Sequence, residues 1–302
     1  MKVVEHLAKA TEPLISFEVI PPLRGSPFSQ LKETLTILAK YNPPFIDVTS
    51  HASGNGTRRA RPGTLGICSY IQQSLRIDAV PHILCHGFTR EETEDLLVDL
   101  NYMEIHNALA LQGDKKHEPK PIPQSRSENV YASDLVTQIA SMNSGVYLEA
   151  RSDSKTNFCI GVAGYPEKHS PASSWEFEIN NLQRKLSNGA SYIVTQMFFD
   201  NEKYFDFVSK CRSQGITAPI IPGLKVITSA NQRTSLPNIF GCNIPPGLEE
   251  ELNRNPQHAY DIGIHHTIQQ SQDLLSRGVP ALHFYVMSRA DAVTKVLSGL
   301  GK

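Results

Sequence analysis

A single carboxyl group interrupts the first apolar segment of the chain. Glu18 stands between Phe17 and Val19 in residues 14–20, a run that predicts a β-strand ended by two prolines. A carboxyl group among apolar side chains loses hydration, which raises its pKa and equips it to donate a proton near neutral pH. The structural alternative is a glutamate paired with an arginine or a lysine, and the residues alone leave both possibilities open.

Other polar side chains follow later apolar segments at the same relative position. They are Thr49, His51, His82, Cys85, His86, Asp114, Tyr165, Gln196, Ser288 and Arg289. Polar residues commonly begin where strands end, so any one of these carries little weight alone. A lone histidine in an apolar strand, such as His82, is more often a packed residue than a ligand. No histidine pair has metal-ligand spacing with a matching acid, so we predict no metal site.

The familiar phosphate-binding and nucleophile motifs do not occur in the sequence. It contains no GxxxxGK[ST] loop, no GxGxxG fingerprint and no GxSxG elbow. If a dinucleotide binds, it does not use the Rossmann device.

Eight segments with strand character alternate with helical segments along the whole chain. We predict strands at 14–20, 45–49, 79–84, 107–111, 159–163, 192–199, 219–224 and 281–287. Thr89 and Glu92 have the spacing of a capping box, which predicts that a helix begins there. No linker divides the chain, so we predict a single α/β domain over residues 1–302, a (β/α)8 TIM barrel, with a doubly wound open sheet as the alternative. In a barrel the active site lies at the carboxyl ends of the strands, where the polar side chains gather.

Composition and charge exclude several classes of protein. The 302 residues are 40% hydrophobic, enough for a large core, and the formal net charge of −1 argues against nucleic-acid binding. No stretch approaches the roughly 20 apolar residues of a membrane span. The five cysteines form no CxxC pair, which favours a reducing, cytoplasmic setting without disulfides or structural zinc.

An ordered set of short strings resembles one enzyme family. The strings are 16–22 (SFEVIPP), 81–85 (PHILC), 110–114 (ALQGD), 131–134 (YASD), 165–169 (YPEKH), 181–185 (NLQRK), 195–200 (TQMFFD), 221–224 (IPGL) and 283–285 (HFY) with Arg289. In this order and spacing the chain resembles methylenetetrahydrofolate reductases of the bacterial type, which consist of the catalytic domain alone. The resemblance extends from about Leu14 to Leu297.

The resemblance implies a flavoprotein with a (β/α)8 barrel. In that family NADH or NADPH reduces bound FAD, and the flavin passes a hydride to 5,10-methylenetetrahydrofolate to give 5-methyltetrahydrofolate, with the two substrates alternating at one site. The alternative is another flavin-dependent TIM-barrel oxidoreductase, such as a proline-dehydrogenase-like enzyme. A barrel lyase or aldolase would need a metal or a Schiff-base lysine, and Lys225 is the one lysine that we place near a strand end. A non-catalytic binding protein would not need the polar set Glu18, Asp114 and Gln196.

The resemblance also implies roles for individual residues. Glu18 is expected to be the general acid that helps to open the folate ring, and Asp114 to lie near flavin and pterin, where a carboxylate lowers the flavin potential. Gln196 and Arg289 are expected to bind substrate. The FAD positions implied are Thr49, His82, Leu111, Gln112, Gly113, Asp114, Tyr131, Ala132, Tyr165, His169, Ala172, Glu178, Asn181, Arg184 and Lys185.

The chain departs from the family pattern at several places. Gln112 stands where many members have arginine, Glu178 where aspartate is common, and Ala230 where some members place a phenylalanine. The segment 225–232 lacks a proline that often follows the Pro-Gly pair. Because the sequence ends at Lys302, we expect no regulatory domain and no control by S-adenosylmethionine through one. The expected partners are folate and nicotinamide nucleotide, with no nucleic acid or membrane, and we expect a homo-oligomer.

Overall fold

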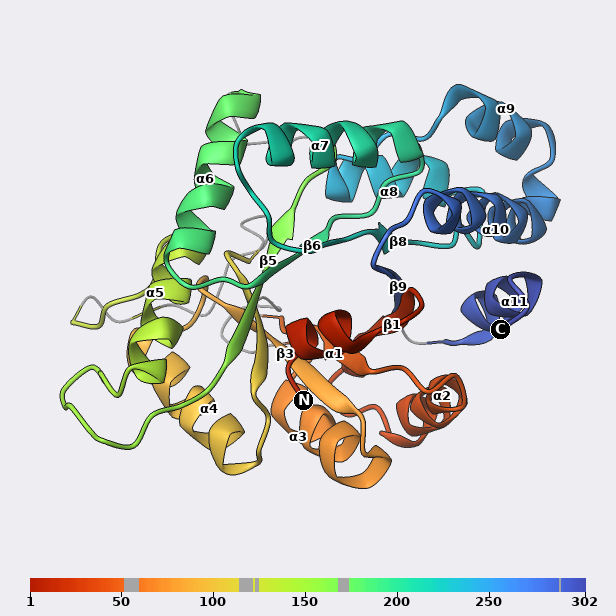
Figure 1. Ribbon diagram of the computed structural model, residues 1–302. Helices are drawn as coiled ribbons and strands as arrows, with labels where there is room; N and C mark the ends of the chain where they lie inside the picture. The colour runs from red at the N-terminus through yellow and green to blue at the C-terminus, as the bar shows by residue number, and fades with distance from the viewer. Residues whose placement is uncertain (52–59, 114–121, 123–124, 168–173, 288) are drawn as a thin grey trace.

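A parallel sheet curls into a nearly closed barrel with helices around it (Figure 1). The computed structural model describes residues 1–51, 60–113, 122, 125–167, 174–287 and 289–302. Every strand pair in the sheet is parallel. The architecture confirms the predicted (β/α)8 barrel rather than the doubly wound open sheet.

The sheet contains nine strands in the order β7-β6-β5-β4-β3-β2-β1-β9-β8. Their bounds are β1 Leu14–Val19, β2 Phe45–Val48, β3 Asp78–Leu84, β4 Asn107–Leu111, β5 Cys159–Gly164, β6 Tyr192–Thr195, β7 Ile220–Ile221, β8 Gly223–Leu224 and β9 Ala281–Met287. Only Pro222 separates β7 from β8, so these two form the seventh strand of an eight-stranded barrel. β7 pairs with β6 and β8 pairs with β9, which brings the two ends of the sheet together.

Helices follow the strands along the chain. They are α1 Val3–Lys9, α2 Ser29–Ala39, α3 Thr64–Ser69, α4 Arg90–Tyr102, α5 Ala132–Asn143, α6 Trp175–Ser187, α7 Asn201–Ser213, α8 Gln232–Phe240, α9 Pro246–Arg254, α10 Ala259–Ser276 and α11 Asp291–Gly299. The predicted capping box at the start of α4 is confirmed, because Glu92 N donates to Thr89 Oγ1 at 3.1 Å and Thr89 N donates to Glu92 Oε2 at 2.9 Å. None of the helices in the described part of the chain is long and apolar enough to cross a membrane.

The predicted strand at 192–199 is too long. The strand ends at Thr195, and Met197 N then bonds to the Gln196 side chain while Phe198 O accepts a hydrogen bond from Gln270 in α10. Apolar residues 197–199 are buried but lie outside the sheet: Met197 and Phe199 pack beneath α8, α9 and α10, and Phe198 stacks against Tyr204 of α7. An apolar run alone does not distinguish these two environments.

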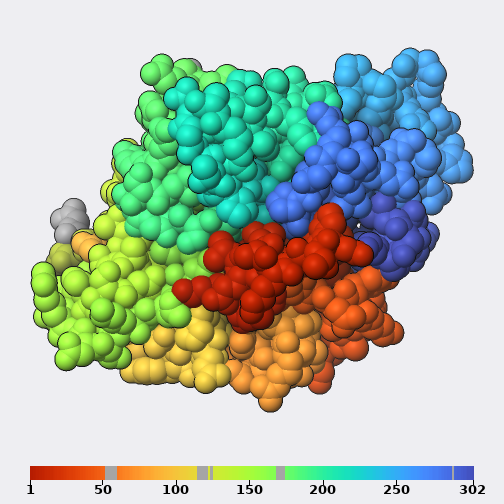
Figure 2. Space-filling model, viewed as in Figure 1, coloured from red at the N-terminus to blue at the C-terminus, as the bar shows by residue number. Residues whose placement is uncertain are grey.

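The interior of the barrel is closed at its amino-terminal end by α1, a helix that we did not predict. Val3 is fully buried, and with Phe45, Val80, Leu109 and further strand residues it forms an apolar cluster against which Val4 and Leu7 of α1 pack. Figure 1 shows α1 in front of the strands. In Figure 2 the same N-terminal segment (red) lies on the visible face, between orange segments below it and teal and blue segments above it. An apolar cluster therefore seals the amino-terminal end of the barrel.

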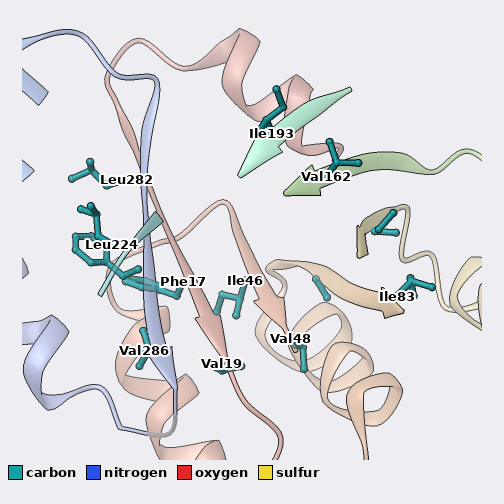
Figure 3. Close-up of a cluster of buried hydrophobic side chains, with 14 of the residues drawn as sticks. Phe17, Val19, Ile46, Val48, Ile83, Val162, Ile193, Leu224, Leu282 and Val286 are labelled. Atoms are coloured by element: carbon teal, nitrogen blue, oxygen red, sulfur yellow. The ribbon is translucent and has the colours of Figure 1, made fainter. Parts of the chain in front are cut away.

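A second, larger cluster fills the space between the strands and the outer helices. Phe17, Val19, Ile46, Val48 and Ile83 belong to it, as Figure 3 shows. Because alternate residues of a strand face opposite sides, these positions place Glu18 and Asp47 on the inner face. The barrel thus directs two carboxyl groups toward its own axis.

Helices α8, α9 and α10 form an added lobe at one side of the barrel (Figure 1). A third cluster, which includes Met197, Phe199, Ile227 and Leu236, packs beneath them. Gly263 of α10 lies so close to Ile227 that a Cβ would stand 1.8 Å from the Ile227 carbonyl oxygen. This lobe fixes the chain that follows β8, including Lys225.

Candidate active site

Glu18 lies near the carboxyl end of β1 and is buried. Burial raises its pKa to about 7; electrostatic interactions with His82 and Lys225 oppose this increase, and the interaction with Asp47 reinforces it. A carboxyl group with such a pKa is still partly protonated at neutral pH and can act as a general acid. The structure therefore gives Glu18 the environment that the apolar strand predicts.

His82 of β3 faces Glu18 inside the barrel. Its Nε2 lies 3.4 Å from Glu18 Oε2 and 3.6 Å from Asp47 Oδ2, and it has no hydrogen-bond partner among the described residues. Burial lowers the pKa of His82, although Glu18 acts in the opposite direction. His82 is thus neither simply packed nor a paired cation but one of three ionisable groups in contact.

Asp47 is the residue of this group that sequence reasoning missed. It is 0% exposed, it lies opposite Glu18 in the β1–β2 register, and neither carboxylate oxygen has a hydrogen-bond partner among the described residues. Burial raises its pKa well above the usual value. The signal in the sequence was an aspartate among the apolar residues of the short segment Phe45–Val48. The structure shows that this strand is fully buried.

Lys225 extends from the end of β8 toward the same region. Its Nζ donates to Tyr285 O at 3.1 Å, and burial lowers its pKa to about 8 while Glu18 opposes that change. The Tyr285 hydroxyl donates to Thr195 O at 2.5 Å, which ties β9 to β6 across the broken seventh strand. A cation therefore stands near Glu18 on the side away from β2 and β3.

Thr49 lies just after β2, among the polar residues that follow the strands at the carboxyl end of the barrel, which we call the rim. Its backbone N donates to Val19 O at 3.0 Å, and its Oγ1 lies 3.0 Å from His51 Nε2. Thr64 at the start of α3 donates from Oγ1 to Thr49 O at 2.9 Å. These bonds fix the turn beside the Glu18 group and leave the predicted cofactor position Thr49 at the carboxyl end of the barrel.

The ends of β3 and β4 form the next part of the rim. Cys85 N donates to Leu111 O and His86 N donates to Gln112 O, each at 3.0 Å. Gly113 has a φ of +88°, and a Cβ there would stand 3.2 Å from His86 Cβ. Gln112 Nε2 donates to Val130 O at 3.1 Å, so this side chain holds the segment before α5.

Helices α5 and α6 bring two cations and an aromatic ring beside that edge. The Arg184 guanidinium lies 6.0 Å from the centre of the Tyr131 ring and donates to Asn181 Oδ1 at 3.1 Å. Burial lowers the pKa of Lys185, with Glu178 opposing that effect, and the half-buried Lys185 acts electrostatically on Cys85. Tyr131 is 54% exposed, so it offers an open aromatic face next to cations.

The predicted substrate residues fall into different surroundings. Gln196 follows β6 and lines a hollow with Tyr165, Met197 and Cys242. Arg289 follows β9, but its Nε binds Asp291 Oδ1 at 3.1 Å and its side chain is 74% exposed. The structure thus places Gln196 in the rim and holds Arg289 against the start of α11.

The remaining predicted positions divide into two sets. Ala132 and Glu178 are buried in α5 and α6, on the side of the barrel that carries Tyr131 and Arg184. Asp114, His169 and Ala172 lie outside the described residues. Within the described ranges no group of three or more metal-ligating side chains occurs.

In sequence, the chain is similar to proteins of one enzyme family. Residues 2–301 match the family model for methylenetetrahydrofolate reductase. The chain is 29% identical to Arabidopsis thaliana methylenetetrahydrofolate reductase (NADH) 1, covering 100% of this chain and 51% of that protein. It is 30% identical to Schizosaccharomyces pombe methylenetetrahydrofolate reductase 1, covering 95% and 45%. The chain thus spans about half the length of these two relatives.

Bacterial relatives and a solved structure match over more of their own length. The Salmonella typhimurium 5,10-methylenetetrahydrofolate reductase is 29% identical, with 95% of this chain and 90% of that protein covered. A Clostridium thermocellum protein that binds two copies of 5-methyl-5,6,7,8-tetrahydrofolic acid has a TM-score of 0.61 at 14% identity, covering 98% and 97%. That structural likeness shows the fold alone. Because the family model matches nearly its whole length, the chain belongs to the methylenetetrahydrofolate reductase family.

Proposed function

We propose that this protein reduces 5,10-methylenetetrahydrofolate to 5-methyltetrahydrofolate with a nicotinamide nucleotide, through bound FAD, in alternating half-reactions. The observation that carries the proposal is Glu18, a buried carboxyl group at the carboxyl end of β1 whose pKa burial raises to about 7. Family membership supplies the reaction, and Glu18 supplies a proton donor in the place where a barrel enzyme has its active site.

The residues at the β3–β4 edge fit a flavin dinucleotide. Gly113 adopts a left-handed conformation that glycine accommodates without strain, and its missing side chain leaves the backbone open to close approach. Arg184 and Lys185 supply positive charge suited to a pyrophosphate, and the exposed Tyr131 ring offers an aromatic face. When bound, FAD would accept a hydride from the nicotinamide nucleotide and pass one to the folate.

The proposed roles of the protein's own groups follow from their positions. The protonated Glu18 carboxyl would donate its proton to a folate ring nitrogen, breaking its O–H bond and favouring the ring-opened iminium that accepts hydride. Thr49, His82 and the backbone at Leu111 and Gln112 would position the flavin, and Gln196 would present an amide donor and acceptor to pterin or nicotinamide. Asp114 beside the flavin and Arg289 toward the folate stay predictions, as do the flavin contacts of His169 and Ala172.

The reductant and the cellular setting are proposals as well. The names of the plant relatives specify NADH, so we propose NADH as the first reductant to test, with NADPH as the alternative. All five cysteines are free and buried, which supports a reducing cytoplasmic setting. A homo-oligomer remains our expectation, and the mass of the protein in solution, measured by light scattering, would test it.

The experiment that tests the function follows the visible flavin spectrum under anaerobic conditions. NADH should bleach the flavin band, and methylenetetrahydrofolate should restore it. In Glu18→Gln, bleaching by NADH should proceed at close to the wild-type rate, whereas reoxidation by the folate should slow about 10²- to 10⁴-fold, the usual value of a general acid.

Glu18→Asp is the matched control, because it keeps an ionisable carboxyl group and should retain part of the folate reaction. Equal loss of both half-reactions in Glu18→Gln would contradict the general-acid role. A protein that stays colourless after incubation with FAD would contradict the flavin site itself.

A further inference from the structure

A second buried carboxyl group inside the barrel has no role in the reaction proposed above. Asp47 and Glu18 are Cα partners on neighbouring parallel strands, so both side chains project from the same level of the sheet into the interior. Asp47 is 0% exposed, and both of its oxygens lack hydrogen bonds within the described part of the chain. Buried carboxylates are normally paired and hydrogen-bonded, so an orphaned one requires an explanation.

His82 connects the two carboxyl groups. The same ring nitrogen, Nε2, stands 3.4 Å from Glu18 Oε2 and 3.6 Å from Asp47 Oδ2. Nε2 of a neutral imidazole carries at most one proton, so it can donate to only one of the two carboxylates at a time. The other carboxyl group must keep its own proton or bear an uncompensated buried charge.

Burial limits how many negative charges this site can hold. His82 is driven toward its neutral form by burial, so ionisation of both carboxyl groups would place two negative charges beside an uncharged ring. Like charges so close in a dry site do not ionise together, as paired carboxylates elsewhere illustrate. The geometry therefore retains one proton on the pair over a pH range in which isolated carboxyl groups would have lost it.

Groups on the surrounding elements do not cancel this effect. The ionisable residues of the described chain that interact electrostatically with the pair are His82, Lys225, Tyr192, Tyr285 and Cys68, and His283 interacts in turn with His82. Burial raises the pKa of Tyr192, Tyr285 and Cys68 and lowers that of His283 to about 3, so these four are uncharged at neutral pH. Lys225 supplies one positive charge, enough for one carboxylate but not for two.

We propose that Asp47 is a positioning residue for the proton of the folate half-reaction: Glu18 and Asp47 hold one proton between them beside His82 Nε2, and their mutual repulsion lets Glu18 keep a proton at a pH where an isolated carboxyl group would lose it. This inference rests on the proposed function, since it assigns a purpose to the protonated state of Glu18. It concerns this chain's own carboxyl groups and requires no contact between Asp47 and substrate.

The test measures the titration of the two carboxyl groups directly in the flavin-loaded protein. Infrared difference spectra between pH values contain the C=O band of each protonated carboxyl group, and Glu18→Gln and Asp47→Asn assign the bands. Asp47→Asn should lower the Glu18 midpoint by about one pH unit. Because coupling is mutual, Glu18→Gln should lower the Asp47 midpoint by the same amount.

Three further variants keep the test decisive. Asp47→Glu retains the charge and should preserve the Glu18 midpoint, whereas Asp47→Ser, a smaller neutral substitute, should lower it as Asp47→Asn does. Asp78→Asn changes a carboxyl group at the other end of β3 and should leave the Glu18 midpoint unchanged. A Glu18 midpoint that is the same in wild type, Asp47→Asn and Asp47→Ser would overturn the proposal.

The pH profile of folate reduction separates this proposal from the general-acid role. In Asp47→Asn the alkaline limb of flavin reoxidation by the folate should move down by the same unit, while flavin reduction by NADH keeps its profile. Normal folate reduction by Glu18→Gln would refute the proposed role of Glu18. The infrared midpoints would still show whether the Glu18 and Asp47 carboxyl groups are coupled. Independent infrared midpoints with an inactive Glu18→Gln would refute only the role of Asp47.

Discussion

The two ends of the barrel interior treat buried polar groups in opposite ways. At the amino-terminal end, Asp78 accepts from the N-terminal ammonium at 2.7 Å and pairs with His6 Nε2 at 2.6 Å. Asn107 accepts from Val3 N at 2.9 Å and donates to Met1 O at 3.0 Å. Toward the carboxyl end, Asp47 and the Nε2 of His82 have no such partners among the described residues.

The pKa values of two aspartates express this difference. Burial by itself raises the pKa of Asp78, but hydrogen bonds from His6 and the N-terminal ammonium outweigh it and leave a net lowering. Asp47 has only the effect of burial, and its pKa is raised. The amino-terminal end is therefore arranged for stability, whereas the carboxyl end keeps costly unsatisfied groups of the kind that active sites need.

The largest effect on stability should come from Asp78→Asn. The folded-state pKa of Asp78 is lowered, so its stabilisation is complete above the unfolded-state value near 4 and disappears as the pH falls through the folded value. Loss of charged hydrogen bonds to two partners should lower the free energy of unfolding by about 1.5–3 kcal/mol at pH 7. Urea unfolding of protein with a free Met1 would measure this.

The same measurement at low pH is the internal control for Asp78. The difference between wild type and Asp78→Asn should shrink as the pH falls below about 4, where the Asp78 carboxylate of the wild type becomes protonated. A loss that stays constant down to the lowest pH at which the protein folds would show that the ion pairs with Met1 and His6 do not stabilise this end of the barrel.

Asp47→Asn should have a smaller effect of opposite sign. The folded-state pKa of Asp47 is raised, so its destabilisation is nil below the unfolded-state value near 4 and grows as the pH rises through the folded value. Removing the ionisable group should therefore raise the free energy of unfolding by about 1–2 kcal/mol at pH 8 and by less at pH 4. A variant less stable than wild type at pH 8 would contradict the contrast between the two aspartates.

The sequence predicted the barrel and most of its strands because alternating apolar segments and helix caps are local patterns. The capping box at Thr89 and the strands at 14–20, 79–84 and 281–287 are each determined by residues that lie close together in the sequence. It could not predict that α1 seals the barrel, since the contacts of Val3 and Met1 with Asn107 join segments more than a hundred residues apart.

The candidate site shows the same limit. Glu18 could be predicted because it interrupts a long apolar strand. Asp47 lies in a short strand, and the sequence pattern singled out only Thr49, the polar residue at the end of that strand. The significance of Asp47 arises from the β1–β2 register and from the reach of His82, which are three-dimensional facts. The substrate role of Arg289 stays a prediction, and its contact with Asp291 two positions along the chain is again a fact of the three-dimensional structure.

The smallest predicted effect concerns Lys225, which faces Glu18 from the side opposite Asp47. Its positive charge favours the ionised form of Glu18, so Lys225→Met should raise the Glu18 pKa and move the alkaline limb of folate reduction upward by about half a pH unit to one unit. Lys225→Arg keeps the charge at every accessible pH and should leave the limb in place. Asp47→Asn and Lys225→Met should thus displace one pH profile in opposite directions, and the double variant should return it toward that of wild type. An unchanged profile in Lys225→Met would mean that Glu18 senses only the carboxyl and imidazole groups of β2 and β3.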